Sequence, residues 1–215
     1  MSLDSHGQRA LDAMRGWALA RRRGLVAMAC GIGLVLGNGP VHAADEWTID
    51  TLMRLQAQTK SSRATFVEQK YLSSVETPLE SSGELSYQAP DRLEKRTLKP
   101  TPESLVLDKD TLLLERKGRK RSIPLQSYPE VGAFVESIRA TLAGDRAGLD
   151  RNYQVELEGK RERWRLLLKP LHAKAATLVS QIRLSGQGEQ VETIEILQGN
   201  GDRSVMTITP QPSAN

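Results

Sequence analysis

Five short segments in the last third of the chain, most of them followed by a turn signal, limit the possible folds. The segments YQVELEGK, RWRLLLKPL, TLVSQIRLSG, QVETIEILQ and RSVMTIT follow one another between residues 153 and 209. Turn-forming glycines lie among them at Gly159, in GQG at 186–188 and in GNGD at 199–202. Strands that recur about every 8–12 residues between turn signals are typical of an antiparallel sheet or barrel.

The middle of the chain continues this pattern. RATFVEQKYL (63–72) and SSGELSYQAP (81–90) alternate apolar and polar residues, as half-buried strands do. RLEKRTLKP (92–100) is more polar, which predicts a strand near an edge of the sheet. The hairpin SLVLDKDTLLLE (104–115) and the segment RKGRKRSIPL (116–125) bring the prediction to about eleven strands in one domain.

Two segments change to a helical period. DEWTIDTLMRLQAQTKS (45–61) predicts an amphipathic helix with acidic residues at its N-terminal end. SYPEVGAFVESIRATLAGD (127–145) places apolar residues at spacings of three and four. Ser127 and Glu130 predict a capping box at its start, and Gly144 predicts its end. The following DRAGLDRN predicts one further helical turn, so two or three helices accompany the strands.

The first residues of the chain have the pattern of an export signal. Arg21 to Arg23 precede a short apolar run over 24–36, and small residues follow it. This order predicts a signal peptide over 1–43, cleaved after Ala43, and a single domain over 44–215. The apolar run is too short to span a bilayer, which needs roughly 20 residues.

Two other leader types fit the sequence less well than a cleaved signal peptide. The paired arginines before Gly24 fit a twin-arginine signal, but the rest of that motif is missing. Cys30 is the only cysteine and fits a lipid-attachment site less well than plain cleavage, because the apolar run continues past it. After cleavage the chain has no thiol, so the domain relies on its hydrophobic core rather than on disulfides.

Charge and composition argue against several function classes. The chain has 30 basic and 26 acidic residues, but five of the basic and two of the acidic ones lie in the leader. The remaining 25 and 24 nearly cancel, so the total charge predicts no nucleic-acid partner. His172 is the only histidine after the leader, and we expect it in a surface loop. Without a nucleophile elbow or a phosphate-binding loop, the sequence predicts no metal site, no cofactor and no enzyme activity.

The hairpin SLVLDKDTLLLE is apolar on both faces, although a half-solvated antiparallel hairpin should alternate. One interpretation needs no ligand: one face is core, and the helices cover part of the other. The other interpretation is a concave sheet that lines an apolar pocket, with the helices as a lid. Val106 and Leu113 point away from the pocket side in either case, so a neighbouring segment covers them or they mark a contact surface.

A run of basic residues follows this hairpin. The simplest interpretation is a solvated hairpin turn, and the functional one is a docking patch for anionic lipid headgroups or an acidic partner. Aromatic residues are not interleaved with the cations, which argues against binding of single-stranded nucleic acid. The predicted docking residues are Arg116, Lys117, Arg119, Lys120 and Arg121.

The order of these elements resembles the periplasmic outer-membrane lipoprotein carrier family (LolA-like). The resemblance is carried by FVEQ (66–69), the glycine strand running into proline (83–90), APDRLEKRTLKPTPESLVLDKDTLLL (89–114) and WRLLLKP (164–170). It ends on GNGDRSVMTIT and covers the chain from about Glu46 to Thr209.

This resemblance implies a mainly β (α+β) fold: a half-closed antiparallel β-barrel of about eleven strands, with two or three helices covering the open side. It implies an apolar cavity that holds acyl chains of a lipoprotein or another lipid while the cargo crosses the periplasm towards the outer membrane. Transient contacts with inner- and outer-membrane partners follow, and we expect a monomer. The alternative is a non-carrier periplasmic interaction or sensor module that binds an envelope partner through the basic turn.

The chain departs from the family at the lid anchor. In well-studied carriers an arginine just before the first proline ties down the helical lid, and Ala89 occupies that position here. Arg92, Lys95 and Arg96 are the candidate substitutes. The family's aromatic residues on this strand are replaced by Glu94, Lys95 and Arg96, which favours a divergent branch with another lipid cargo.

We predict that acyl chains contact both the sheet and the lid. The predicted lining residues on the sheet are Phe66, Leu85, Tyr87, Leu105, Leu107, Leu112, Leu114, Leu166 and Leu168. Those on the lid helix are Phe134, Val135 and Ile138.

Overall fold

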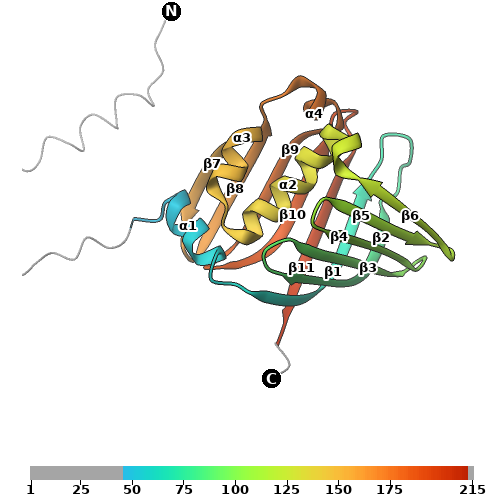
Figure 1. Cartoon of the computed structure of the whole chain (residues 1–215), viewed down its shortest axis with the longest axis horizontal. Helices are drawn as coiled ribbons and strands as arrows, with labels where there is room; N and C mark the ends of the chain where they lie inside the picture. The colour runs from blue at the N-terminus through green and yellow to red at the C-terminus, as the bar shows by residue number, and fades with distance from the viewer. Residues whose placement is uncertain (1–45, 213–215) are drawn as a thin grey trace, which may run out of the picture. The chain divides into compact units, whose positions relative to one another are not determined.

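The computed structural model describes residues 46–212, which form one eleven-stranded antiparallel sheet and four α-helices (Figure 1). The prediction of a mainly β fold with about eleven strands is confirmed. The predicted signal peptide and its cleavage site lie outside the described residues. The strands are β1 (Ser61–Tyr71), β2 (Leu79–Gln88), β3 (Arg92–Lys99), β4 (Glu103–Asp108), β5 (Thr111–Arg116), β6 (Arg119–Pro124), β7 (Tyr153–Lys160), β8 (Arg163–Pro170), β9 (Val179–Gln187), β10 (Gln190–Gln198) and β11 (Arg203–Gln211).

The sheet consists of two meanders joined at its centre. Its order is β6-β5-β4-β3-β2-β1-β11-β10-β9-β8-β7, so β1 and β11 pair with each other and β6 and β7 form the two edges. The sheet is therefore not closed, as predicted. The expected edge position of the strand over 92–100 is wrong, because β3 lies between β2 and β4. The strand is polar because Arg92, Glu94 and Arg96 lie on the face of the sheet that the helices do not cover.

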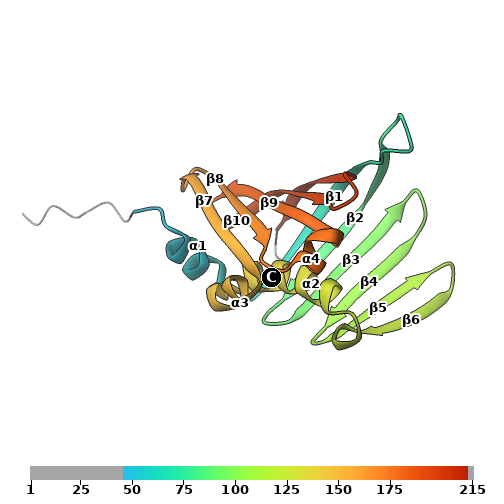
Figure 2. The same ribbon diagram turned by 90° about the horizontal axis from the view of Figure 1, so that it is seen from above.

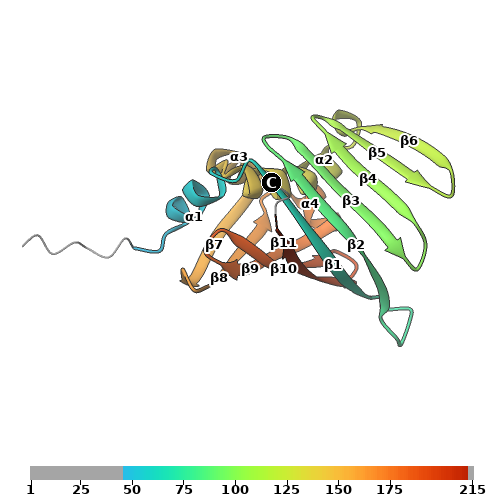
Figure 3. The same cartoon turned by 90° about the horizontal axis from the view of Figure 1, so that it is seen from below.

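The helices gather on one side of the curved sheet (Figures 2 and 3). The segment over 125–152 contains two of them and connects the edge strand β6 to the edge strand β7. A short helix between β8 and β9, which the sequence did not predict, has six residues and buries only Ala175. The helical elements are α1 (Ile49–Gln56), the 3-10 turn η2 (Leu125–Ser127), α2 (Pro129–Ala143), α3 (Arg146–Asn152) and α4 (Ala173–Leu178).

The two ends of α2 differ in how well the sequence predicted them. The capping box is wrong: Ser127 closes the η2 turn, Tyr128 takes the N-cap position and makes no side-chain capping bond, and Pro129 opens the helix. The predicted end is confirmed, because Gly144 adopts the left-handed conformation with φ of 69°. A Cβ there would lie 2.1 Å from the Met53 carbonyl oxygen, so glycine also allows the close approach of α1.

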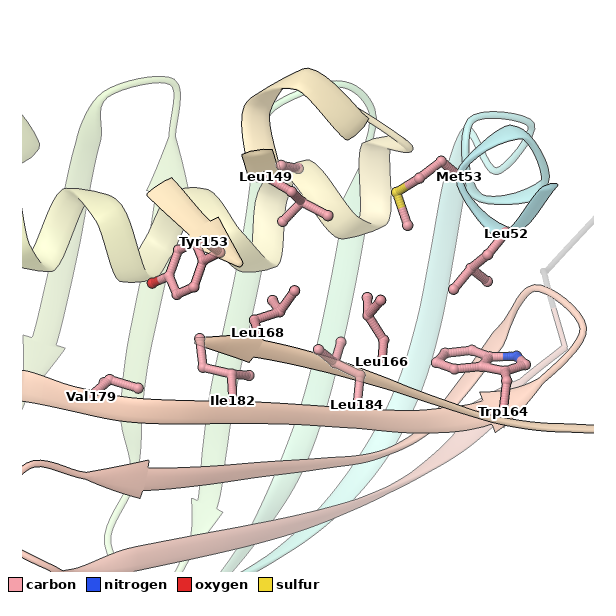
Figure 4. Close-up of a cluster of buried hydrophobic side chains, with 11 residues drawn as sticks. Leu52, Met53, Leu149, Tyr153, Trp164, Leu166, Leu168, Val179, Ile182 and Leu184 are labelled. Carbon is pink, nitrogen blue, oxygen red and sulfur yellow. The ribbon is translucent and has the colours of Figure 1, made fainter. Parts of the chain in front are cut away.

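The main hydrophobic core lies between β7–β9 and the helices α1, α2 and α3 (Figure 4). Alternate residues of β8 point into it, and the indole Nε1 of Trp164 donates a hydrogen bond to the Gly188 carbonyl at 2.9 Å. Its buried members are Leu52, Met53, Ala140, Leu149, Tyr153, Trp164, Leu166, Leu168, Val179, Ile182 and Leu184.

A second, smaller cluster lies at the other end of the sheet, between β4–β5 and the start of α2. Its buried members are Leu107, Leu112 and Leu125, and half-buried residues including Val131 and Val135 pack against them. These two valines share one face of α2, so the same helix contacts both halves of the sheet. We call this group the second cluster.

Candidate functional site

We call the face of the sheet towards α1, α2 and α3 the inner face. Residues that oppose one another in register on neighbouring strands point to the same face. Leu114 opposes Leu105, which opposes Lys95 on β3, and Lys95 opposes Leu85 on β2. The neighbouring row contains two members of the second cluster, which places both rows on the inner face. The structure thus brings six predicted lining residues together: Leu85, Tyr87, Leu105, Leu107, Leu112 and Leu114.

Other predicted lining residues lie in the main core instead. Leu166 and Leu168 are 0% exposed and contact the protein's own side chains (Figure 4). Phe134 and Ile138 of α2 pack against the same cluster. These four residues fix the helices to the β7–β9 half of the sheet.

A half-buried aliphatic strip remains beside the second cluster. Leu85, Leu105 and Leu114 are neither fully buried nor fully exposed, whereas Leu107 and Leu112 of the adjacent row are buried. Sequence reasoning missed Met206 and Ile208, which are half-buried on the inner face of β11 opposite Glu68 and Phe66. The alternation of RSVMTIT could have identified them.

A buried ion pair lies at the centre of the inner face. The Lys95 amine is 2.5 Å from a carboxylate oxygen of Glu68, whose side chain is 5% exposed. The same amine stands 4.9 Å from the centre of the Phe66 ring, a cation–π contact. Ser81 donates a further hydrogen bond to Glu68 at 3.4 Å. Lys95 therefore lies in the row between Leu85 and Leu105, and its amine is directed to Glu68 on β1.

The candidate substitutes for the missing lid arginine all bind within the sheet. Lys95 pairs with β1, as described above. Arg92 pairs with Asp108 at 2.9 Å, and Arg96 lies 3.9 Å from Glu84. Among the ion pairs of residues 46–212, none joins these three cations to a helix.

The residue that ties α2 to the sheet lies on the helix itself. Arg139 of α2 donates a hydrogen bond to the Lys109 carbonyl at 3.2 Å and lies 3.7 Å from an Asp110 carboxylate oxygen. Glu136, one turn earlier, holds the same guanidinium through its Nε at 2.8 Å. We call the contact of Arg139 with the β4–β5 turn the latch. The spacing of Glu136 and Arg139 is the sequence signal that could have indicated an ion pair on α2.

We expect Arg139→Gln to loosen α2 without unfolding the domain. A partly exposed ion pair contributes about 1 kcal/mol, so opening of α2 should become about fivefold more frequent. Amide hydrogen exchange over 129–143 measures this opening. Arg92→Gln is the matched control, because it removes an ion pair with the same hairpin but touches no helix. Equal exchange in the two variants would show that the latch does not hold the lid.

Tyr87 carries a polar atom that the fold leaves without a partner. Its side chain is 4% exposed, and its hydroxyl has no hydrogen-bond partner among residues 46–212. Burial raises the pKa of this hydroxyl above its usual range, and the charge of Asp91 raises it further. The hydroxyl is therefore protonated at neutral pH and remains a free donor on the inner face.

Tyr87→Phe is expected to raise the free energy of unfolding by about 1 kcal/mol, because it removes a buried donor that has no acceptor and keeps the ring. Urea unfolding measures the change. The control is Tyr153→Phe, since the Tyr153 hydroxyl donates to the Ala133 carbonyl at 3.2 Å and its loss should destabilise the domain by a similar amount. Destabilisation by Tyr87→Phe would mean that its hydroxyl is bonded in solution.

The basic run lies in the turn between β5 and the edge strand β6. Lys117 and Gly118 form that turn with positive φ values of 51° and 71°. All five cations are exposed. On the outer face of the same hairpin, Leu113 is 45% exposed, so no segment covers it, and Val106 opposite is half-buried.

Two surface depressions lie away from the helices. One of about 510 Å³ is on β1–β3 and β11, beside Val67, Leu98 and Thr207. The other, of about 310 Å³, lies at the β7–β8 and β9–β10 turns, beside Arg161 and Gln187. No helix residue lines either one, so neither is a space between lid and sheet.

The described residues carry no cluster of metal-ligating side chains. Within residues 46–212, no group of three or more histidine, cysteine, aspartate or glutamate side chains is placed to hold a metal ion. His172 is exposed beside the start of α4, as expected. None of the helices over these residues has both the length and the apolar character needed to cross a membrane.

Three solved structures are similar to this chain over most of its length, at low sequence identity. A LolA superfamily protein from Nitrosomonas europaea is 8% identical, with 78% of this chain and 95% of that chain covered and a TM-score of 0.44. The Pseudomonas aeruginosa MucA/MucB complex gives 14% identity, 78% and 57% coverage, and a TM-score of 0.44. LprF from Mycobacterium bovis gives 10% identity, 78% and 96% coverage, and a TM-score of 0.33.

The sequence itself gives the assignment. No curated protein matches the chain at a significant level. A family model described as "Outer membrane lipoprotein carrier protein LolA-like" matches residues 38–211, which include every strand and helix of the structure. The chain therefore belongs to the outer membrane lipoprotein carrier protein LolA-like family.

Proposed function

We propose that this protein is an exported carrier for lipids. It binds acyl chains of a lipoprotein or another lipid on the inner face and carries the cargo across the periplasm towards the outer membrane. The half-buried strip of Leu85, Leu105 and Leu114 is the observation that supports this proposal most directly. The strip lies beside the second cluster and offers aliphatic surface that is only partly covered in the fold.

The unequal packing of the lid supports the same proposal. The main core contains eleven buried residues, and the second cluster contains three. Hydrophobic stabilisation scales with buried apolar area, so the second cluster contributes less to the packing between helix and sheet than the main core does. Each methylene that a ligand buries contributes roughly 0.8 kcal/mol, so ten would give about 8 kcal/mol before the costs of binding.

Loading requires α2 to move away from β4–β5. The lid and the sheet are in contact at the latch and at the second cluster, where Val131 and Val135 meet Leu107 and Leu112. An acyl chain that enters between them replaces these contacts with its own. A ligand shifts this equilibrium only by the difference in its affinity for the open and closed states.

Native mass spectrometry of protein purified from the periplasm tests the proposal. We expect a co-purifying lipid mass on the wild-type protein and its loss in Leu114→Glu. The same spectrum reports whether the protein is a monomer, as we propose. A clean apo mass for the wild-type protein would contradict the carrier function.

A second candidate is an interaction module without lipid cargo. The observation that favours it is the exposed basic turn of β5 and β6, which an acidic envelope partner could bind. Such a module would show only the mass of the protein without lipid in native mass spectrometry. Its Leu114→Glu variant would bind the partner as tightly as the wild-type protein does. Charge reversal at Lys117 and Lys120 would abolish that binding.

A further inference from the structure

The basic hairpin does not carry its charge evenly on its two faces. Arg116 opposes Arg119, and Arg121 opposes Leu114 of the half-buried strip. Two residues further along the same strands, Leu112 opposes Ile123, and both belong to or pack against the second cluster. Since side chains alternate along a strand, all three arginines point to the inner face.

Ion pairing leaves two of these arginines free. Arg116 lies 3.5 Å from a carboxylate oxygen of Glu103, which also faces inwards. Arg119 and Arg121 have no carboxylate within 4.0 Å among residues 46–212. The inner face of the hairpin therefore ends in two guanidinium groups without anionic partners.

The outer face of the hairpin differs. Lys120 points outwards and lies 3.5 Å from Glu115, so part of its charge is neutralised. Binding to an anionic membrane surface alone does not require the unpaired cations to lie on the same face as the half-buried aliphatic strip. The placement instead puts apolar surface and unpaired arginines next to each other on one face.

We propose that the cargo is an anionic amphiphile whose phosphate group binds Arg119 and Arg121 while its acyl chain lies on Leu105 and Leu114. This inference rests on the proposed carrier function. Positions two residues apart on a strand are about 7 Å apart, so a chain on Leu114 ends within reach of the arginines. Guanidinium groups bind phosphate oxygens through paired hydrogen bonds, and two of them match its double charge.

Two soluble probes with the same chain separate headgroup from tail: dodecyl phosphate and dodecyl maltoside, each titrated below its micelle concentration by calorimetry. The wild-type protein should bind dodecyl phosphate about tenfold or more tightly than dodecyl maltoside. The double variant Arg119→Gln/Arg121→Gln should bind the two probes within about twofold of each other. Lys117→Gln/Lys120→Gln, which removes the same charge from the turn and the outer face, should keep the wild-type preference.

Each remaining result has one meaning. Equal binding of both probes by the wild-type protein overturns the headgroup site and leaves the carrier function standing. Equal loss of preference in both double variants also overturns it, because general charge attraction would then explain the preference. Binding of inorganic phosphate as tightly as dodecyl phosphate would assign the arginines to a free anion. Binding of neither probe would contradict the carrier function itself. All four substituted residues are exposed, and thermal unfolding should confirm that both variants fold.

Discussion

Leu114→Glu is expected to weaken acyl-chain binding at least about a hundredfold while the domain stays folded. The carboxylate would face water in the free protein but would be buried against the acyl chain in the complex, at a cost of several kcal/mol. Leu114 is half-buried and opposes Arg121, so the free protein accommodates the new charge. Titration with a neutral fluorescent probe, N-phenyl-1-naphthylamine, measures the affinity, and circular dichroism checks the fold.

Leu113→Glu is the matched control for this prediction. It makes the same change one residue away, on the outer face, where the leucine is 45% exposed. We expect wild-type affinity from this variant. Leu107→Glu cannot replace Leu114→Glu in this test, because Leu107 is buried in the second cluster and a carboxylate there would unfold that region. Similar affinities for Leu114→Glu and the wild-type protein would remove the strip from the binding surface.

Leu168→Ala is expected to lower the free energy of unfolding by about 3–5 kcal/mol. The side chain is wholly enclosed by the main core, so its truncation leaves a cavity that the surrounding strands and helices cannot fill. A loss of this size is a large part of the total stability of an ordinary domain, about 5–15 kcal/mol. Chemical denaturation measures it, and probe binding at low temperature should stay within about twofold of wild type.

The neighbouring residue again supplies the comparison. Leu167 is half-buried on the outer face of the same strand, so Leu167→Ala should cost about 1 kcal/mol or less. If Leu168→Ala kept its stability and lost probe binding, Leu168 would line the ligand site as the sequence predicted. The pairs Leu113/Leu114 and Leu167/Leu168 thus distinguish residues that stabilise the fold from residues that bind the ligand.

Alternation along the strands was enough to place the predicted lining residues of the sheet on one face. It could not show which of them are buried in the protein's own core and which stay partly exposed. Leu105 and Leu166 follow the same pattern in sequence. The difference lies in what covers them: Leu166 is 0% exposed in a cluster with residues of α1, α2 and α3, whereas Leu105 is half-buried beside the smaller second cluster. Part of this coverage comes from α1, about 110 residues before β8, and a local pattern does not contain such a contact.

Local rules also explain what was mispredicted. The Ser127 to Glu130 spacing fits a capping box, but Ser127 is the last residue of η2, and α2 begins two residues later with Tyr128 as its N-cap. The polar strand over 92–100 was expected at an edge, because a strand with one open face and a strand at an edge are both rich in charge. The latch was missed because Arg139 contacts a carbonyl and a carboxylate in a turn far from it in sequence, and no local pattern identifies such a partner.

The seam between β1 and β11 has a consequence for folding. Residues 63–71 pair with residues 203–211, so the centre of the sheet joins segments about 140 positions apart in the chain. Contacts of such long range form late and slowly, because the loop between them must first be ordered. Without β11, the inner edges of the two meanders stay unpaired. The sheet is therefore completed only after almost all residues of the domain are available for folding, because β11 is the last strand in the chain.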